Sequence, residues 1–265
     1  MIGIFDSGVG GLTVVKQVFT ALPTCQVVYF GDTARVPYGN KSVAMVRKYA
    51  RQDTEFLLHQ GVKIVVIACH TVSAVAADFL REKFPMVTIF DVVGPGLDRA
   101  LALTNSKKIG IIGTENTVKS QAHQKYLQKI NPAVEVFYQA CPLFVPLVEE
   151  GWLDRPETRK IARYYLNPLK RAGIDTLVLA CTHYPLLEEV IKKVIGKRIR
   201  IVDPAQEVAL EIKRYLSAKT EVEKGLVKNS PPHRFYLSDL TAKFPIISQR
   251  VLGRVVKVEQ VEVEK

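Results

Sequence analysis

The sequence has 265 residues, of which 48% are hydrophobic and 24% are charged. These values are typical of a folded chain with a sizeable core, arranged as one large domain or two small ones. No apolar run approaches the roughly 18 residues that a membrane helix needs, and the opening residues MIGIFDSGVGG lack the basic region of a signal peptide. The sequence therefore argues against a membrane protein and predicts a cytoplasmic location.

The net charge is +11, from 37 Lys and Arg residues against 26 Asp and Glu residues. Such a charge can attract nucleic acid or anionic substrates by long-range steering. The positive residues are spread along the chain, however, and no basic block is interleaved with aromatic residues. We therefore interpret the charge as a solvated surface and do not expect nucleic acid as a partner.

Four cysteines lie at positions 25, 69, 141 and 181. None of them forms a CxxC pair or a cysteine–histidine cluster with zinc-site spacing, so no metal is expected. Disulfides are not expected in the cytoplasm. A cysteine without further context, such as Cys25 or Cys141, is interpreted as a small buried hydrophobe.

Short β-branched runs alternate with amphipathic stretches along the chain. Strands are predicted, in order, at 1–5, 26–30, 63–68, 87–91, 108–113, 134–138, 176–180 and 199–202. Helices are predicted at 41–60, 73–84, 95–104, 117–130, 157–172, 184–195 and 205–218. A polar linker at 219–233 precedes a strand at 235–238, a helix at 239–252 and a strand-like tail that would form a sheet edge. This alternation, with continuously apolar strands, indicates an α/β fold with parallel sheets covered on both faces.

The sequence also contains a weak internal repeat. The tripeptide IGI at 2–4 recurs at 109–111, and KIVVIACHT at 63–71 resembles DTLVLACTH at 175–183. The two offsets, 107 and 112 residues, are similar. A repeat of this length indicates two halves built on one plan.

Cys69 and Cys181 end the two matched strands, each just before a predicted helix. Ligands of open α/β sheets bind beyond the carboxyl ends of the strands, and a helix N-terminus stabilises a thiolate or an anionic ligand. Racemisation needs a base on one side of a carbon and an acid on the other. Two thiols from two matched halves suit both roles, because the ordinary thiol pKa of about 8.5 is near neutrality.

A glycine-rich segment, DSGVGG at 6–11, follows the first strand. It is neither a GxGxxG motif nor a P-loop. Its backbone N–H groups could hold a carboxylate, with Ser7 donating a further bond, and the alternative is a tight strand–helix turn. Asp6 is expected to be hydrogen-bonded or functional, because a carboxylate at a strand end is otherwise costly.

Five segments resemble the signature sequences of bacterial glutamate racemases and occur in that family's order: FDSGVGGLTV (5–14), GDTARVPYG (31–39), ACHTVSA (68–74), LVEEG (147–151) and ACTHYPLL (180–187). The resemblance covers nearly the whole chain. It implies two pseudo-symmetric, doubly wound α/β domains with the active site in the cleft between them. The first domain would comprise 1–95 and 209–265, and the second, inserted domain would comprise 96–208.

The resemblance further implies interconversion of L- and D-glutamate for peptidoglycan synthesis, without pyridoxal phosphate or metal. Glutamate would be the small-molecule partner, and a homodimer is one assembly that the family allows. Cys69 would be the base that acts on D-glutamate, and Cys181 would be the base that acts on L-glutamate. Asp6 would support Cys69, while Glu149 and His183 would support Cys181. The substrate site implied by the resemblance consists of Asp6, Ser7, Tyr38, Gly39, His70, Thr71, Thr182 and His183.

One position departs from the family's pattern. The family usually has Ala-Cys-Asn-Thr where this chain has Ala68-Cys69-His70-Thr71. A neutral imidazole could accept a hydrogen bond from the substrate ammonium, whereas a protonated one would repel it or lower the pKa of Cys69. We expect altered affinity or pH dependence, with activity retained.

Three alternative functions remain open from the sequence. An aspartate racemase usually has Cys-Thr-Glu where this chain has Cys181-Thr182-His183. A hydrolase could use Cys69 and His70 as nucleophile and base, although adjacent residues at a strand end point apart. A degenerate relative could bind an amino acid or a protein without turnover, but the presence of both cysteines with Asp6, Glu149 and His183 argues against it.

Overall fold

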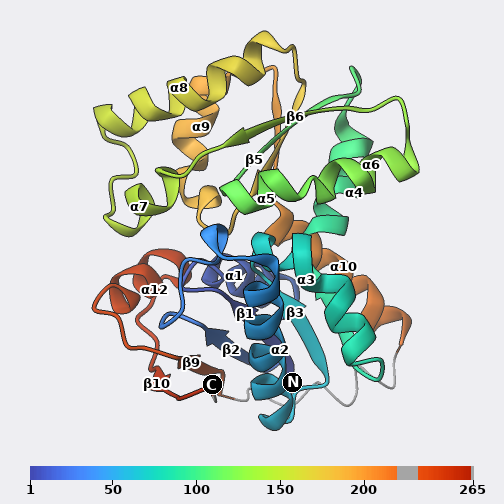
Figure 1. Cartoon of the computed structure of the whole chain (residues 1–265). Helices are drawn as coiled ribbons and strands as arrows, with labels where there is room; N and C mark the ends of the chain where they lie inside the picture. The colour runs from blue at the N-terminus through green and yellow to red at the C-terminus, as the bar shows by residue number, and fades with distance from the viewer. Residues whose placement is uncertain (220–231, 264–265) are drawn as a thin grey trace.

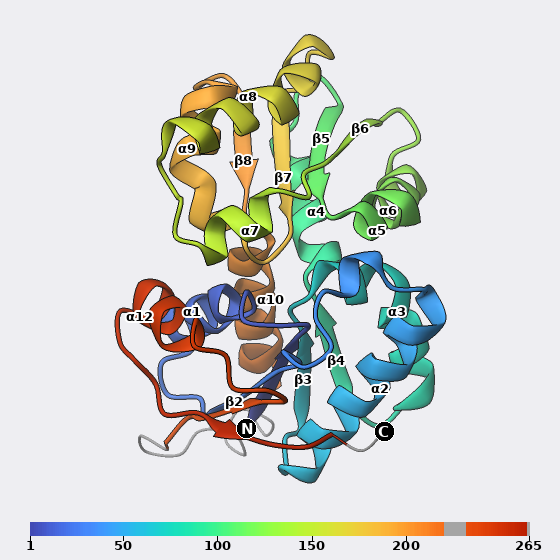
Figure 2. The ribbon, with the colours of Figure 1, turned by 60° about the vertical axis from the view of Figure 1, so that its left-hand side comes forward.

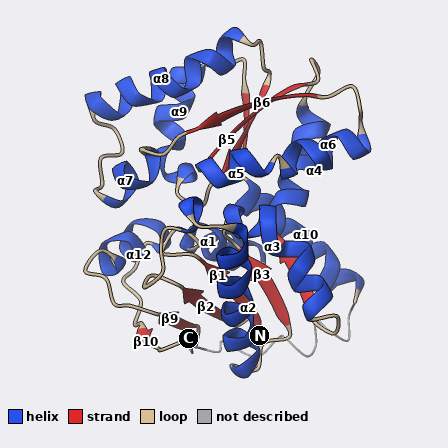
Figure 3. Cartoon of the chain, in the orientation of Figure 1, coloured by secondary structure: helices blue, strands red, loops and turns tan. Residues whose placement is uncertain are grey.

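The structure, a computed structural model, describes residues 1–219 and 232–263. Its strands form two parallel sheets with helices on both faces, which confirms the predicted α/β fold (Figures 1 and 3). The predicted linker at 219–233 lies almost entirely outside the described residues.

The first sheet has six strands in the order β10-β9-β2-β1-β3-β4. They are β1 (Ile2–Asp6), β2 (Val27–Gly31), β3 (Ile64–Ile67), β4 (Thr88–Asp91), β9 (Arg234–Leu237) and β10 (Glu259–Gln260). The second sheet has the order β6-β5-β7-β8, from β5 (Lys108–Gly113), β6 (Glu135–Ala140), β7 (Thr176–Ala180) and β8 (Arg200–Val202).

The internal repeat corresponds to a shared topology. The order β2-β1-β3-β4 in the first sheet matches β6-β5-β7-β8 in the second. The matched glycines have the same packing role: a Cβ at Gly3 would press on Val62, just before β3, and one at Gly110 would press on Ile174, just before β7. β1 thus corresponds to β5, and the cysteine-bearing strand β3 to β7.

Helices bury apolar faces on both sides of each sheet. They are α1 (Leu12–Ala21), α2 (Val43–His59), α3 (His70–Lys83), α4 (Val93–Leu103), α5 (Glu115–Ser120), α6 (Ala122–Ile130), α7 (Phe144–Glu149), α8 (Pro156–Arg171), α9 (Glu188–Ile195), α10 (Pro204–Ala218) and α12 (Phe244–Leu252). Two 3₁₀ turns, η1 (Tyr38–Asn40) and η2 (Tyr184–Leu187), complete them. We call the six-stranded sheet with α1, α2, α3, α10 and α12 the first lobe, and the four-stranded sheet with α4 to α9 the second lobe (Figure 2).

The chain crosses between the lobes at two equivalent places. After β4, Asp91 accepts a hydrogen bond from Val93 N at the start of α4; after β8, Asp203 accepts one from Ala205 N at the start of α10. Val93 packs in the core of the second lobe and Ala205 in that of the first. The domain limits at 95/96 and 208/209 stay a prediction, and these packing contacts favour crossing points a few residues earlier.

Several elements differ from those predicted. Helices α1 and α7 were not among the predicted ones. The predicted helix 117–130 is divided at Gln121, whose φ of 50° lies in the left-handed region. The predicted helix 73–84 begins at His70, and the last helix begins only at Phe244. The tail does add a strand at the sheet edge, but β10 has only two residues.

Across residues 1–219 and 232–263, none of the helices combines the length and the apolar character needed to cross a membrane.

Candidate active site

The carboxyl ends of both sheets face one pocket of about 430 Å³. Ser7 follows β1 and Cys69 lies just beyond β3 in the first lobe, while Thr114 follows β5 and Cys181 follows β7 in the second. The two thiols therefore line the same space from opposite lobes. This is the geometry that the strand-end argument predicts.

Most of the predicted site residues line this pocket: Ser7, Tyr38, Gly39, Cys69, His70, Thr71, Glu149, Cys181, Thr182 and His183. Asp6 does not line it. The remaining lining residues were not predicted: Val36, Pro37, Asn40, Thr114, Glu115, Pro142, Val145, Pro146 and Ala180.

Cys69 is the N-cap residue of α3, and its Sγ lies 3.4 Å from Ser7 Oγ. Burial, assisted by the nearby Asp6, raises the pKa of Cys69 to about 12, although the Ser7 hydroxyl and the Val72 N–H oppose this shift. The sequence argument expected the helix N-terminus to favour a thiolate. Because Cys69 is buried, the loss of hydration outweighs that effect, and Cys69 holds its proton at neutral pH.

Asp6 lies behind the pocket wall and is only 1% exposed. Its Oδ2 accepts a hydrogen bond from Gly8 N at 3.1 Å, and its Oδ1 lies 3.5 Å from Thr182 Oγ1 of the second lobe. Burial raises its pKa, against the opposing field of His183 and the N–H groups of Gly11 and Gly8. Some N–H groups of the glycine-rich segment thus donate hydrogen bonds to Asp6 itself and not to a ligand in the pocket.

On the opposite wall, Cys181 Sγ lies 4.0 Å from His183 Nδ1. The other ring nitrogen, Nε2, lies 3.4 Å from Glu149 Oε1, which is within ion-pair distance but not in hydrogen-bond geometry. Burial alone would lower the pKa of His183, but the contacts with Cys181 and Glu149 raise it to about 10. His183 is therefore protonated at neutral pH and lies between the Cys181 thiol and the Glu149 carboxylate.

Tyr38 presents its ring to the pocket and directs its hydroxyl away from it. The hydroxyl donates to Asp32 and lies 3.1 Å from Asp53 Oδ2, while Arg35 contacts Asp32 at 2.6 Å and Asp53 at 2.8 Å. Burial, followed by the charge of Asp32, raises the pKa of Asp53. The ion pair between Asp32 and Arg35 braces the loop that carries Tyr38 and Gly39.

His70 is 4% exposed, and neither of its ring nitrogens has a hydrogen-bond partner within the described part of the chain. Burial lowers its pKa well below the ordinary value, and the neighbouring His123 of α6 adds to the shift. Burial likewise lowers the pKa of His123 to about 4. Both imidazoles are neutral near pH 7, and the hydrogen-bonded Cys69–His70 dyad of the hydrolase alternative is not formed.

Contacts across the cleft bring the lobes together around the pocket. Thr13 Oγ1 donates to Thr182 O at 3.0 Å, and Asn116 Nδ2 donates to Tyr38 O at 3.2 Å and Lys41 O at 2.7 Å. A third contact joins the hydroxyls of Thr71 and Thr114, 3.1 Å apart.

At Gly10 an added Cβ would lie 2.5 Å from His183 Nδ1 and closer still to Thr182 Oγ1. Gly10 therefore permits the glycine-rich segment to approach the Cys181 wall closely.

Over residues 1–219 and 232–263, no group of three or more His, Cys, Asp and Glu side chains is arranged to hold a metal ion. The polar groups of the pocket are thiol, hydroxyl, imidazole and carboxylate. They can exchange protons and bind a zwitterion.

The sequence model of the Asp/Glu/Hydantoin racemase family matches residues 13–212. A curated glutamate racemase from Geobacter metallireducens is 46% identical over 252 residues, which is 95% of this chain and 92% of that protein. The chain belongs to the glutamate racemase family.

Solved structures of the family agree with this assignment. A glutamate racemase isoform from Bacillus anthracis superposes with a TM-score of 0.94 at 36% identity, over 99% of this chain and 97% of that one. A glutamate racemase from Francisella tularensis, solved in complex with D-glutamate, gives a TM-score of 0.90 at 35% identity, again over 99% and 97% of the chains. The family fold thus extends over both lobes.

Proposed function

We propose that this protein interconverts L- and D-glutamate by two-base proton transfer between Cys69 and Cys181. One observation carries the proposal: the two thiols end the equivalent strands β3 and β7 and line one pocket from opposite lobes. An amino acid held between them can lose its α-proton to one thiolate, and the planar carbanion that results can receive a proton on its opposite face from the other thiol. The named relatives are glutamate racemases, so the aspartate alternative and the non-catalytic alternative are not favoured.

In the proposed reaction from L-glutamate, Cys181 is the base. Its thiolate takes the α-proton, so a C–H bond breaks and an S–H bond forms, and Cys69 then donates its thiol proton to the opposite face. Burial raises the pKa of Cys69 to about 12, so this thiol holds the proton that it donates in this direction. The charged imidazole of His183 lies on the same wall as Cys181, with its Nδ1 4.0 Å from Sγ of that cysteine. The reaction from D-glutamate exchanges the two roles.

The proposed substrate contacts follow from the chemistry of the lining. Thr71, Thr114 and Thr182 offer hydroxyl donors for the carboxylates, together with backbone N–H groups at the start of α3. The neutral imidazole of His70 can accept from the α-ammonium. Asp6, behind the wall, would act through Gly8 and Thr182 and not by touching the substrate.

The cellular setting is proposed from the family resemblance alone. We propose a cytoplasmic enzyme that supplies D-glutamate for peptidoglycan, with a homodimer as the assembly to test first. Light scattering of the purified protein measures that assembly directly.

Proton exchange in heavy water tests the function. Purified protein is incubated with L-glutamate and, separately, with L-aspartate, while optical rotation and α-deuterium uptake are followed. Loss of rotation with glutamate alone, with deuterium in the product, is expected. Absence of exchange with both amino acids, from protein with a cooperative melt, would remove the proposal.

The two thiols are tested by Cys69→Ser and Cys181→Ser. Each variant should lose racemisation by at least the roughly 10²- to 10⁴-fold that a positioned acid or base contributes, because a serine hydroxyl is too weak an acid to replace a thiol. Cys25→Ala, in the core of the first lobe, is the matched control and should keep its activity. Full activity in either serine variant would exclude the two-base mechanism.

A further inference from the structure

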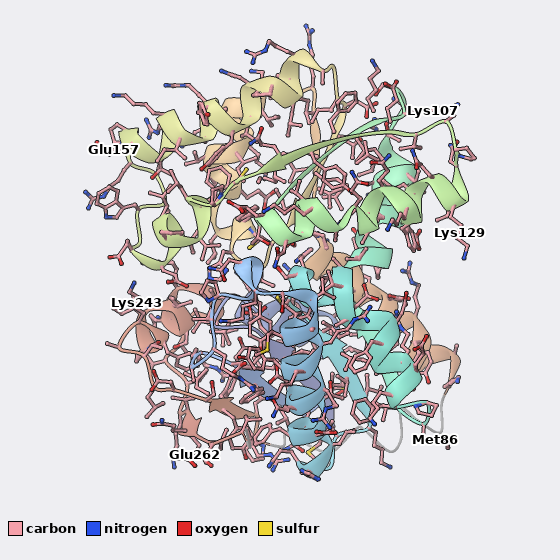
Figure 4. All side chains as sticks on the ribbon, in the orientation of Figure 1. Met86, Lys107, Lys129, Glu157, Lys243 and Glu262 are labelled. Atoms are coloured by element: carbon pink, nitrogen blue, oxygen red, sulfur yellow. The ribbon has the colours of Figure 1, made fainter. Side chains whose placement is uncertain are left out.

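Two basic residues at helix α12 of the first lobe contact the end of helix α7 in the second. Lys243, labelled at the left in Figure 4, lies just before α12, and its Nζ lies 2.7 Å from Glu150 Oε1 and 4.0 Å from Glu149 Oε2. From the same helix, Arg250 Nη1 donates to Val148 O of α7 at 3.1 Å. Helix α12 therefore contacts the end of α7 by charge and by hydrogen bond.

Both charges of this contact lie at unfavourable helix ends. Glu149 is the last residue of α7, where a helix is least compatible with negative charge, and Lys243 is the N-cap residue of α12, where positive charge is disfavoured. Neither residue is explained by the stability of its own helix. Facing each other across the cleft, each neutralises the unfavourable charge of the other.

The two oxygens of Glu149 have different neighbours. Oε2 faces Lys243, whereas Oε1 lies 3.4 Å from His183 Nε2. The other nitrogen of His183 lies 4.0 Å from Cys181 Sγ. The contacts thus run in series from Lys243 through Glu149 and His183 to the thiol, and Lys243 itself does not line the pocket.

We propose that Lys243 is a positioning residue for the Cys181 half of the reaction: its ammonium holds Oε2 of Glu149 so that Oε1 is directed at His183. This inference rests on the proposed racemase function. It also couples the position of the first lobe to the acid–base pair of the second, because the ammonium and the carboxylate belong to different lobes.

The charged and titratable groups around this series come from four elements. Glu149 faces His183 and Lys243; Lys243 also faces Glu150; and His183 faces Cys181 and, from the end of β1, Asp6. The contact with His183, and then the charge of Lys243, lower the pKa of Glu149 against the effect of burial. Removing the ammonium should therefore raise the pKa of Glu149 and move the acid limb of the pH profile of kcat/KM to higher pH.

The test compares three variants of the full-length enzyme over pH 4–9 with both enantiomers of glutamate. Lys243→Met should lower kcat at neutral pH by about two- to fivefold, the range of a partly exposed ion pair, with little change in KM and an upward shift of the acid limb. L- and D-glutamate have equal free energies in water, so kcat/KM must fall by the same factor in both directions. Lys243→Arg should restore most of the activity and the wild-type profile.

Glu150→Gln is the matched control. It removes the shorter ion pair of Lys243 but leaves Glu149 in place, so its acid limb should remain at the wild-type pH. An unchanged profile in Lys243→Met, or the same shift in Glu150→Gln, would overturn the inference, since the contact would then only join the lobes. An inactive wild-type enzyme would instead overturn the proposed function, so the two failures are distinguishable.

Discussion

His70 stands where the resemblance to the family predicts an asparagine, and its surroundings limit what it can do. Its ring is buried and neutral, so it neither repels the substrate ammonium nor lowers the pKa of the adjacent Cys69. Of the three effects weighed from the sequence, only hydrogen-bond acceptance by a neutral imidazole is compatible with this environment.

We predict that His70→Asn keeps kcat/KM within about tenfold of the wild-type value, because an amide can accept the same single hydrogen bond. Any change in the pH profile should lie on its acid side, where His70 would otherwise take up a proton. Steady-state kinetics from pH 5 to 9 measure both effects. An inactive variant with an intact melt would show that the imidazole has an essential role that an amide cannot perform.

Much of the candidate site could be predicted residue by residue. Cys69 and Cys181 follow from the matched strand ends, and Thr114 could have been found by adding the repeat offset of 107 to Ser7. The position of Asp6 at the end of β1 was predicted correctly. That its carboxylate binds Gly8 N and does not line the pocket depends on tertiary packing. The apolar wall of Pro142, Val145 and Pro146 carries no sequence signal of its own.

At the scale of elements, the glycine-rich loop between β1 and α1 allows the two lobes to approach each other closely. Gly10 lies where any side chain would meet Thr182 and His183, whereas a Cβ at Gly8 would make only an ordinary contact with Val36 at 3.4 Å. The two glycines therefore offer a matched comparison within one loop.

We predict that Gly10→Ala displaces the Cys181 wall and lowers kcat/KM by about 100-fold, the cost of a misplacement of about 1 Å at a reacting centre. Overpacking should also reduce the free energy of unfolding by about 1–3 kcal/mol. Gly8→Ala should differ little from the wild type in both measurements. Equal activity in the two variants would contradict the close approach at Gly10.

The strands were easier to predict from the sequence than helix α1, which follows this loop. Strands β5 and β7 were predicted with their observed limits, because continuous apolar β-branched runs have few alternatives. Helix α1 begins directly after Gly10 and Gly11 and is rich in valine and threonine, so local propensity does not favour it. It is stabilised by packing against α10 and α12, which come from the other end of the chain.

For the whole molecule, the two neutral histidines between the lobes link stability to acid. His123 has a pKa of about 4 in the folded protein against an ordinary value of 6.5, and His70 is shifted in the same direction. The unfolded chain therefore binds more protons than the folded one below pH 6.5, so the free energy of unfolding falls as the pH falls through this window.

We predict that the wild-type protein loses stability between about pH 6.5 and 4, and that His123→Gln loses less. The shift of His123 alone corresponds to roughly 3 kcal/mol at the acid end. Urea unfolding at each pH measures the difference, with His59→Gln, on the exposed side of α2, as the control. Parallel stability curves for wild type and His123→Gln would contradict the assignment.

The place of β9 in the first sheet has a consequence for synthesis on the ribosome. The second lobe has all four of its strands once residue 202 has been made, whereas β2 remains an open edge until residues 234–237 can pair with it. All five residues of β2 are buried in the finished protein, and an exposed apolar edge pairs readily with other chains. The first lobe is therefore begun first but is the last to complete its sheet. During most of its elongation, the nascent chain exposes the unpaired edge of β2, which is prone to aggregation.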